Sequence, residues 1–222
     1  GNGLTVSGAL DDPFEHVRLF IDPQVTDVRF DDLSLSISND NLIYAEGEST
    51  SGELTVTIAG LCSFDNYGSY TSGGYRYSFA AIESERNLRL LGEDAAAELQ
   101  LDTEAGASGL ICGGSAVIQN LTLTVNMVIT QELLGVTDNW GKLPAAFHNG
   151  KYSGSNWSFI DSTVTVDTDG RGFGNRGFGI IGSIDVYRCD FSLTSAFSYI
   201  DEAAALTITD STFAVSGKSR IG

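Results

Sequence analysis

Four tyrosines within one glycine-rich segment are the residues of this sequence best suited to hold a ligand. The segment begins at Phe64, and the tyrosines are Tyr67, Tyr70, Tyr75 and Tyr77. Flat aromatic faces stack on the apolar C–H faces of sugar rings, while phenol hydroxyls form hydrogen bonds with ring hydroxyls. The segment therefore predicts a saccharide platform. The alternative is a loop that packs its tyrosines on the flank of the fold.

A second group of aromatic and basic residues lies in residues 131–155, a stretch that interrupts the repeat described below. It holds Trp140, His148 and Tyr152, together with two of the three lysines of the chain. Long loops on a regular scaffold are where function often concentrates. We therefore predict that Trp140 and Tyr152 contact a ligand, with a lid over the fold as the alternative. His148 has no carboxylate or cysteine partner in the sequence, so we expect a lone core or solvated histidine.

Two arginines in another glycine-rich segment, residues 170–179, complete the predicted ligand-binding set. Arg171 and Arg176 are suited to pair with the carboxylate of an acidic sugar. Their Arg-Gly-Phe context superficially resembles an RNA-binding tract, but the acidity of the chain argues against RNA. We expect two glycine turns here.

Asp167 and Asp169 precede Gly170 and are the candidate metal ligands. Alternating carboxylates before a glycine turn can present hard oxygen ligands to calcium. A complete EF-hand loop is absent, because no glutamate follows at the required distance. Solvated turn carboxylates are the alternative.

The sequence assigns no catalytic residue. A polysaccharide lyase would need calcium to acidify a sugar carbon and a lysine or arginine base to take the proton. Nothing in the sequence places a basic residue beside an acidic cluster. A hydrolase would need two carboxylates at a set separation, which sequence cannot test. A non-enzymatic role is therefore favoured, and a lyase remains the enzymatic alternative.

The charge of the chain excludes several partners. There are 12 Lys and Arg against 29 Asp and Glu, a formal net charge of −17. A nucleic acid backbone or an anionic membrane surface would be repelled. No apolar run is as long as a membrane span. The start at Gly1-Asn2-Gly3 is compatible with an export signal that has been removed.

The three cysteines are interpreted as small core residues. Cys62 and Cys112 lie in apolar, strand-like runs, and Cys189 occupies a slot that serine fills in two neighbouring repeats. A bridge between Cys62 and Cys112 stays open, because nothing in the sequence supports or excludes it.

A repeated template must position all these residues. It consists of one apolar residue, a few mostly polar positions, and two apolar residues spaced by one. It occurs five times, at 28–35, 118–125, 159–166, 186–193 and 208–215. Units too short to bury a core alone indicate a solenoid, and three short strands per repeat indicate a parallel β-helix. An antiparallel sandwich is the alternative.

The template predicts one all-β domain over residues 1–222, a single-stranded parallel β-helix of about seven coils. Residues 1–27 are expected to form an N-terminal cap with the first strands, 131–155 a loop insertion, and 217–222 a tail. Asn120, Asp161 and Asp210 share one turn position and predict a ladder of side chains bonded to neighbouring backbone.

Short motifs follow one another over about residues 4–125, among them Leu4-Thr-Val-Ser-Gly, Leu54-Thr-Val-Thr-Ile-Ala-Gly, Asn87-Leu-Arg-Leu-Leu-Gly and Leu121-Thr-Leu-Thr-Val. In these motifs the first half of the chain resembles a family of bacterial right-handed parallel β-helices that bind carbohydrate and are related in fold to pectate lyases. The resemblance implies right-handed coiling, calcium ions at the helix surface, affinity for acidic or cellulosic plant cell-wall polysaccharide, and a secreted or surface-anchored protein.

These observations together predict an extracellular or cell-surface protein that binds polysaccharide without catalysis, with calcium as a candidate aid. Anchoring through lipid or the cell wall, by way of a missing N-terminus, is compatible with this. A structural stalk or adhesin module of the bacterial surface is the main alternative, and a polysaccharide lyase is the second.

Overall fold

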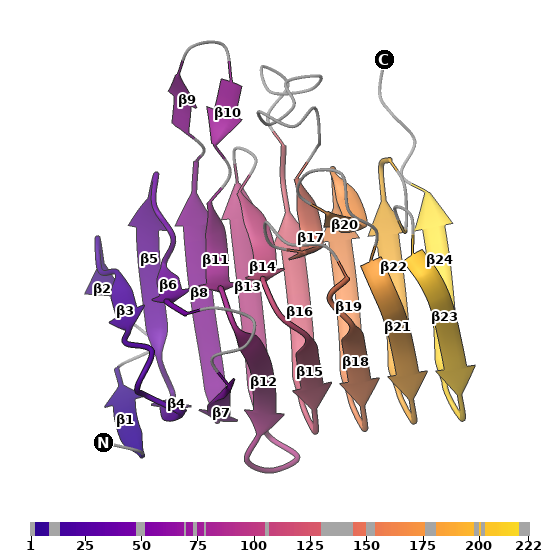
Figure 1. Ribbon diagram of the computed structural model, residues 1–222, viewed down its shortest axis with the longest axis horizontal. Coiled ribbons are helices and arrows are strands. Elements are labelled where there is room, and N and C mark those ends of the chain that lie inside the picture. The colour runs from indigo at the N-terminus through magenta and orange to yellow at the C-terminus, as the bar shows by residue number, and fades with distance from the viewer. Residues whose placement is uncertain are drawn as a thin grey trace.

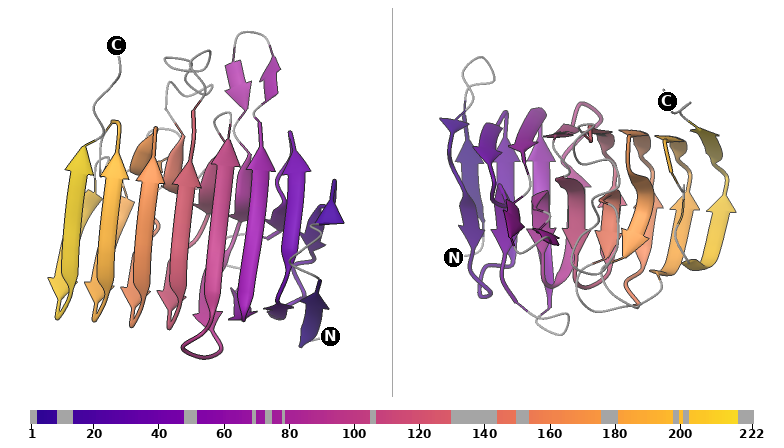
Figure 2. Two further views of the ribbon diagram at one scale, coloured as in Figure 1. Left: turned by 180° about the vertical axis from the view of Figure 1, so that it is seen from behind. Right: turned by 90° about the horizontal axis from the view of Figure 1, so that it is seen from above.

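All regular structure in the described residues is β-strand, arranged in three parallel sheets and one small hairpin. The computed structural model describes residues 3–8, 14–47, 52–68, 70–72, 75–77, 79–104, 107–129, 144–149, 154–175, 181–197, 200 and 203–217. The strands stack along the long axis, from β1 near the N-terminal end to β23 and β24 at the opposite end (Figure 1). Figure 2 shows the same stack from behind and from above.

Sheet A and sheet B contain eight parallel strands each. Sheet A is formed, in order, by β1 (Leu4–Ser7), β4 (Asp27–Asp31), β7 (Glu53–Ala59), β12 (Asn87–Gly92), β15 (Ala116–Gln119), β18 (Trp157–Ile160), β21 (Ile181–Tyr187) and β23 (Ala203–Thr209). Sheet B is formed by β2 (Phe14–Glu15), β5 (Ser34–Ser38), β8 (Leu61–Tyr67), β13 (Glu98–Glu104), β16 (Thr122–Met127), β19 (Thr163–Thr168), β22 (Asp190–Ser195) and β24 (Thr212–Gly217).

Sheet C contains six parallel strands, and a separate hairpin lies in the chain between β8 of sheet B and β11 of sheet C. The strands of sheet C are β3 (Leu19–Ile21), β6 (Ile43–Ala45), β11 (Ala80–Ser84), β14 (Ser108–Cys112), β17 (Ala145–Asn149) and β20 (Arg171–Asn175). The antiparallel hairpin consists of β9 (Tyr70–Ser72) and β10 (Tyr75–Tyr77).

The chain visits sheets C, A and B in turn, so that β3, β4 and β5 are followed by β6, β7 and β8 and so on. The predicted all-β class with parallel strands is confirmed, and the arrangement is consistent with a parallel β-helix. About seven coils and right-handed coiling stay predictions. Within the predicted insertion, residues 145–149 form β17 of sheet C, and residues 131–143 lie outside the described residues.

The repeat template sets the strand register. Ile118 pairs with Phe159, Phe159 with Val186, and Val186 with Ile208, as the apolar spacing predicts. Each of these residues except the last is at most 1 % exposed. Side chains alternate across a strand, so a residue paired with a buried one is itself placed toward the interior.

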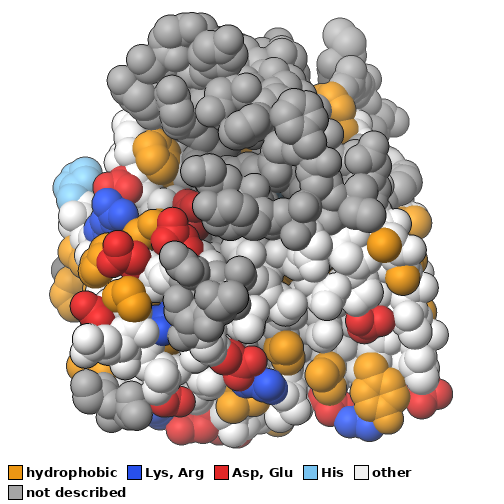
Figure 3. Space-filling view, viewed as in Figure 1, with side chains coloured by type: hydrophobic (Ala, Val, Ile, Leu, Met, Phe, Trp, Pro, Cys, Tyr) orange, Lys and Arg blue, Asp and Glu red, His pale blue; other side chains and the backbone are white. Residues whose placement is uncertain are grey.

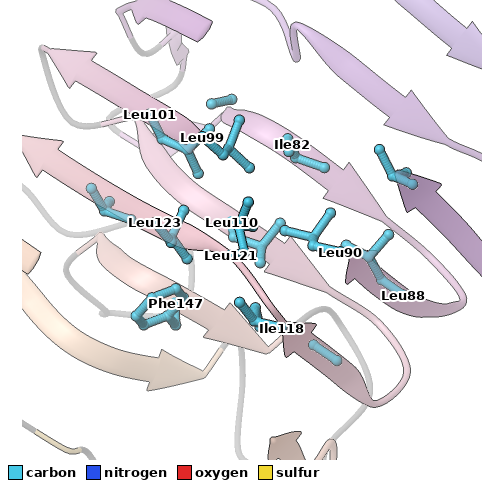
Figure 4. Close-up of a cluster of buried hydrophobic side chains, with 14 of the residues drawn as sticks. Ile82, Leu88, Leu90, Leu99, Leu101, Leu110, Ile118, Leu121, Leu123 and Phe147 are labelled. Atoms are coloured by element: carbon cyan, nitrogen blue, oxygen red, sulfur yellow. The ribbon is translucent and has the colours of Figure 1, made fainter. Parts of the chain in front are cut away.

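One continuous apolar core fills the space enclosed by the three sheets. Strands of sheets A and B alternate between buried and half-exposed residues, as in β12 and β13. Figure 4 shows leucine and isoleucine side chains from β11 to β16 meeting in this core, with Phe147 at one side. The core lies between the sheets, and the outward rows of sheets A and B are therefore free to be polar.

Aromatic rings dominate the core in the C-terminal half. Phe147 on β17 lies 4.9 Å from Phe173, 5.3 Å from Phe159 and 5.4 Å from Trp157, measured between ring centroids. All four side chains are 0 % exposed. The indole Nε1 of Trp157 donates a 2.7 Å hydrogen bond to Asn149 Oδ1, which satisfies its polar group inside the core.

The corner between sheets A and B is a tight turn in which one residue adopts the left-handed backbone conformation. Asp32, Asn120, Asp161, Arg188 and Asp210 have φ between 44° and 51°. Asparagine and aspartate tolerate this conformation best among non-glycine residues. Arg188 is held there by a bidentate ion pair with Asp161 of the preceding coil. The residues that the template aligned at one position therefore share one backbone conformation.

The side-chain ladder at this corner lies one residue beyond the predicted position. The Ser162 hydroxyl donates to Ile160 O at 2.8 Å and accepts from Leu121 N at 3.3 Å. Ser211 bonds Thr209 O and accepts the N–H of Cys189 in the same way. A hydroxyl suits this role because it can both donate and accept. At the predicted position, which Asn120, Asp161 and Asp210 share, the backbone N–H groups of Asn120 and Asp161 bond backbone carbonyls and need no side-chain partner.

All three cysteines are free and buried, which confirms their interpretation as core residues. Cys189 Sγ lies 3.3 Å from Tyr187 O, two residues back, as the hydroxyls of the equivalent serines do. Cys62 and Cys112 form no bridge. The described part of the chain contains no helix long and apolar enough to cross a membrane.

Candidate functional site

The predicted tyrosine platform begins on β8 and continues into the hairpin. Tyr67 ends β8 and is 39 % exposed. In the hairpin, Tyr77 pairs with Tyr70 and Tyr75 pairs with Ser72. Directly opposite residues of an antiparallel pair share a face, and so do residues two apart on one strand. The register therefore places Tyr70, Tyr75 and Tyr77 at positions on one face of a hairpin that projects beyond the sheets (Figure 1).

The surface beside Tyr67 is acidic. Tyr67 lies in register with Glu104, and Asp65 lies in register with Asp102 on the same outward face of sheet B. Partial burial, followed by the charges of Asp65 and Glu104, raises the pKa of the Tyr67 phenol. Partial burial and the charge of Asp102 likewise raise the pKa of Asp65. A phenol that stays protonated in this setting can donate a hydrogen bond to a neutral hydroxyl-rich ligand.

Of the other predicted ligand residues, only Arg171 lies in the part of the chain that the structure describes. Trp140, Tyr152 and Arg176 lie outside the described residues. Arg171 is part of β20 and only 5 % exposed, so the surface role predicted for it is not supported by its position. Two glycine turns were expected over residues 170–179; residues 171–175 instead form a strand, because β20 pairs with β17, and residues 176–179 lie outside the described residues.

His148 is a core residue, one of the two outcomes that the sequence left open. It is 3 % exposed, and its Nδ1 lies 2.7 Å from Asn149 O. Its neighbours along β17 are buried on both faces of sheet C. This histidine is therefore not presented to solvent.

Asp167 and Asp169 lie at the end of β19 and just after it. Asp167 is exposed on the outward face of sheet B, and Asp169 Oδ2 lies 3.4 Å from the N–H of Ile129. Within the described ranges, no group of three or more His, Cys, Asp or Glu side chains is arranged to hold a metal ion. Two carboxylates alone supply fewer ligands than calcium takes in proteins.

An exposed aromatic pair on sheet C was not predicted. Phe20 on β3 lies in register with Tyr44 on β6, and the ring centroids are 5.9 Å apart with the planes tilted by 35°. Phe20 is 56 % exposed, the largest exposed fraction among the large hydrophobic residues described. β3 buries Ile21 and turns Phe20 outward, because successive side chains alternate across a strand.

Charged groups frame this pair. The Arg18 guanidinium lies over the Tyr44 ring, 5.2 Å from its centroid, and its Nη1 bonds Asp40 Oδ2 at 3.1 Å. Burial, then a hydrogen bond with the Glu85 carboxylate, raises the pKa of the Tyr44 phenol. Glu85 Oε2 also accepts the N–H of Gly47 at 3.3 Å. We call Phe20, Tyr44, Arg18, Asp40 and Glu85 the aromatic patch.

The aromatic patch combines an apolar surface with fixed polar groups. The Arg18 cation is neutralised by Asp40 and positioned over an aromatic face, an arrangement that favours Arg over Lys. At the N-terminal side of the face in Figure 3, apolar, basic and acidic side chains lie next to one another. In the sequence, the only indication of this pair is that each aromatic residue lies at the centre of an apolar triplet, Leu19-Phe20-Ile21 and Ile43-Tyr44-Ala45.

An open pocket of about 390 Å³ lies at the corner between sheets A and B. It is lined by Gly92 to Ala95, Asn120 to Thr122, Asp161 and Thr163. Two of its three acidic residues form ion pairs, Glu93 with Arg29 and Asp161 with Arg188, and Asp94 Oδ1 accepts the N–H of Ala96 at 2.8 Å. It has no exposed aromatic surface.

Comparisons with protein-family models, with curated proteins and with solved structures returned no match.

Proposed function

We propose that this protein binds polysaccharide without catalysis, through the aromatic patch. The observation that carries the proposal is Phe20, more than half exposed and paired with Tyr44 on the outward face of sheet C. A contiguous apolar surface rimmed by polar residues is typical of a binding site, whereas single exposed apolar residues are common. The C–H face of a pyranose ring matches such a surface in size and polarity.

The polar groups around the ring pair give this surface the means to orient a bound sugar. Asp40 and Glu85 supply hydrogen-bond acceptors, and Arg18 supplies donors, around the edge of the ring pair. Sugar hydroxyls both donate and accept, so a neutral or weakly acidic glycan meets partners of both kinds. The tyrosine hairpin, with three tyrosine positions on one face, is a second candidate contact for a long chain.

The surface arginines that the structure describes do not favour lyase chemistry. Arg18, Arg29, Arg89 and Arg188 each form an ion pair with a carboxylate. Hydrogen bonds with Glu93 and Asp31 raise the pKa of Arg29, and a hydrogen bond with Asp161 raises that of Arg188. A cation stabilised in this way is a poor proton acceptor.

The test is a binding measurement with single-residue variants. We expect a glycan array and co-sedimentation with insoluble cell-wall polysaccharide to identify a ligand. Phe20→Ala should weaken binding roughly 2- to 13-fold, because an aromatic contact contributes about 0.5–1.5 kcal/mol. Val128→Ala is the matched control, since Val128 is an exposed apolar residue directly after β16 of sheet B, outside the patch.

Four outcomes are informative. Loss with Phe20→Ala and not with Val128→Ala supports the patch, whereas loss only with Tyr67→Ala moves the site to the end of β8, beside the hairpin. Absence of binding to any glycan, with and without a chelator, would refute the proposal and favour a structural stalk. Formation of unsaturated uronide from pectic substrates would instead show a lyase.

A further inference from the structure

One buried arginine contacts the backbone next to a strand that lies two places away in sheet C. Arg86 comes two residues after β11 and is 0 % exposed. Its Nη1 donates a 2.9 Å hydrogen bond to Pro23 O, and its Nη2 donates one of 3.3 Å to Asp22 O. Asp22 and Pro23 directly follow β3, which is separated from β11 by β6. Strands two places apart in a sheet are about 10 Å apart, farther than a backbone hydrogen bond reaches.

The partners of this guanidinium are unusual for a buried charge. Among the described residues it bonds two carbonyl groups and no carboxylate, and its Nε has no hydrogen-bond partner. An incompletely paired cation is unfavourable in a protein interior, and an apolar side chain of similar volume often replaces such a group without loss of stability. Burial alone therefore does not account for an arginine at this position. What arginine adds is a planar set of donors that holds two carbonyl groups in one geometry.

The residue before Arg86 contacts the other strand of the aromatic patch. Glu85 forms a hydrogen bond with the Tyr44 phenol on β6, and its Oε2 accepts the N–H of Gly47, two residues after β6. The Glu85 N–H also donates a 3.0 Å hydrogen bond to Ala45 O at the end of β6. The connection between β11 and β12 therefore contacts β6 through Glu85 and the end of β3 through Arg86.

The connection that carries these two residues is itself held firmly. The Ser84 hydroxyl donates to Arg86 O at 3.0 Å and accepts the N–H of Arg86 at 3.3 Å. On the other side, the Gly113 N–H donates a 2.7 Å hydrogen bond to Ser84 O, and a Cβ at Gly113 would lie only 2.7 Å from Glu85 O. The next connection along the stack thus packs directly against this one, so Arg86 extends from a fixed base.

We propose that Arg86 is a positioning residue of the aromatic patch, which holds β3, and with it Phe20, in place beside Tyr44. β3 has three residues and, in the described chain, pairs with β6 alone. So short a strand forms few hydrogen bonds, and a contact directly after it limits the movement of Phe20. A binding surface that is ordered in advance loses less entropy when its ligand binds. The role in binding rests on the polysaccharide function proposed above, whereas the positioning can be measured without a ligand.

Hydrogen exchange on the full chain measures the positioning. Three backbone N–H groups report on β3 and the turn after it, those of Leu19, Val25 and Glu46, which bond Leu42 O, Asp22 O and Ile21 O. Arg86→Met should speed their exchange about 10-fold or more, because a hydrogen bond to a charged group is among the stronger ones in a protein. Exchange in β13 and β16 should change less. Arg89→Met is the matched control, since it removes a surface arginine of β12 that pairs with Glu53, and it should leave the three reporters unchanged.

A selective increase at the three reporters supports the proposal. An equal change in β13 and β16 would show that Arg86 only stabilises the fold as a whole, and no change at the reporters would show that it does not hold β3. Either result overturns the proposal. Circular dichroism checks folding, and Arg86→Lys replaces Arg86→Met if that variant is unfolded, because lysine keeps the charge and lacks the planar set of donors.

Co-sedimentation with insoluble cell-wall polysaccharide tests the role in binding. Arg86→Met and Phe20→Ala should each weaken binding, and the double variant should bind about as weakly as Phe20→Ala alone, because residues that act through one contact are not additive. Additive losses would overturn the assignment of Arg86 to the placement of Phe20. If the wild-type protein binds no polysaccharide, the proposed function is refuted, and the exchange rates still decide whether Arg86 holds β3.

Discussion

Replacement of Phe147 by alanine tests whether the aromatic core holds the C-terminal half together. Phe147 is fully buried, and three rings lie within 5.4 Å of its centroid. A buried Phe→Ala change costs about 3–5 kcal/mol, and each close ring pair adds about 0.5–1.5 kcal/mol beyond area burial. With three close pairs, we expect a loss near the upper limit, about 5 kcal/mol of unfolding free energy.

Phe213 is the internal comparison. It is partly buried on β24 and has a ring contact with Phe191 at 5.0 Å. Partial burial of one phenylalanine is worth about 1–2 kcal/mol, so Phe213→Ala should cost less than half as much. Phe147→Leu, which keeps most of the apolar volume, should fall between the two.

Urea unfolding followed by circular dichroism measures these differences, and the slope m reports whether the surface exposed on unfolding has changed. A loss below about 2 kcal/mol for Phe147→Ala at unchanged m, or an equal loss for Phe213→Ala, would refute this account of the core.

Three further predictions rest on single features. Asp65→Asn should raise the unfolding free energy at pH 7 by about 0.2–1 kcal/mol, because burial and the opposing Asp102 raise the pKa of this carboxyl. The gain should disappear below pH 3.8, where the carboxyl is protonated in both the folded and the unfolded state. Urea titrations at pH 7 and below pH 3.8 check this. Asn120→Val should cost about 1–2 kcal/mol in thermal unfolding, because a β-branched residue is strained at φ 51°, whereas Asn120→Gly should not show this loss. Burial raises the pKa of Cys112 to about 12 and that of Cys62 to about 11, so a thiol reagent at pH 8 should label them only after unfolding; rapid labelling of the native protein would contradict their burial.

The strand register was predictable from the sequence because it depends on a local pattern. Apolar residues alternate within each strand, and a shift by one residue would turn every buried side chain to solvent. The template residues Phe159, Val186 and Ile208 therefore align in the structure as they align in the sequence. The serine-like role of Cys189 follows from the same alignment.

The aromatic patch was not predictable in the same way. Phe20 and Tyr44 are 24 residues apart and meet because β3 and β6 pair in one register. Each strand has only three residues, too few for alternation to identify an outward face. For Arg171 the local sequence was misleading. Its glycine-rich context indicated a turn, but pairing of β20 with β17 makes it a buried strand residue.

The uneven length of the coils has a practical consequence. Ala116 pairs with Trp157, 41 residues later, whereas Ile184 pairs with Leu206, only 22 residues later, and sheet A keeps its register through both. Extra residues between sheets B and C are thus accommodated without changing which residues pair, because closing a longer loop costs little additional entropy. A foreign peptide inserted in the hairpin between β9 and β10 should leave the strand pairing intact, so the fold offers a rigid platform for displaying sequences unrelated to its own.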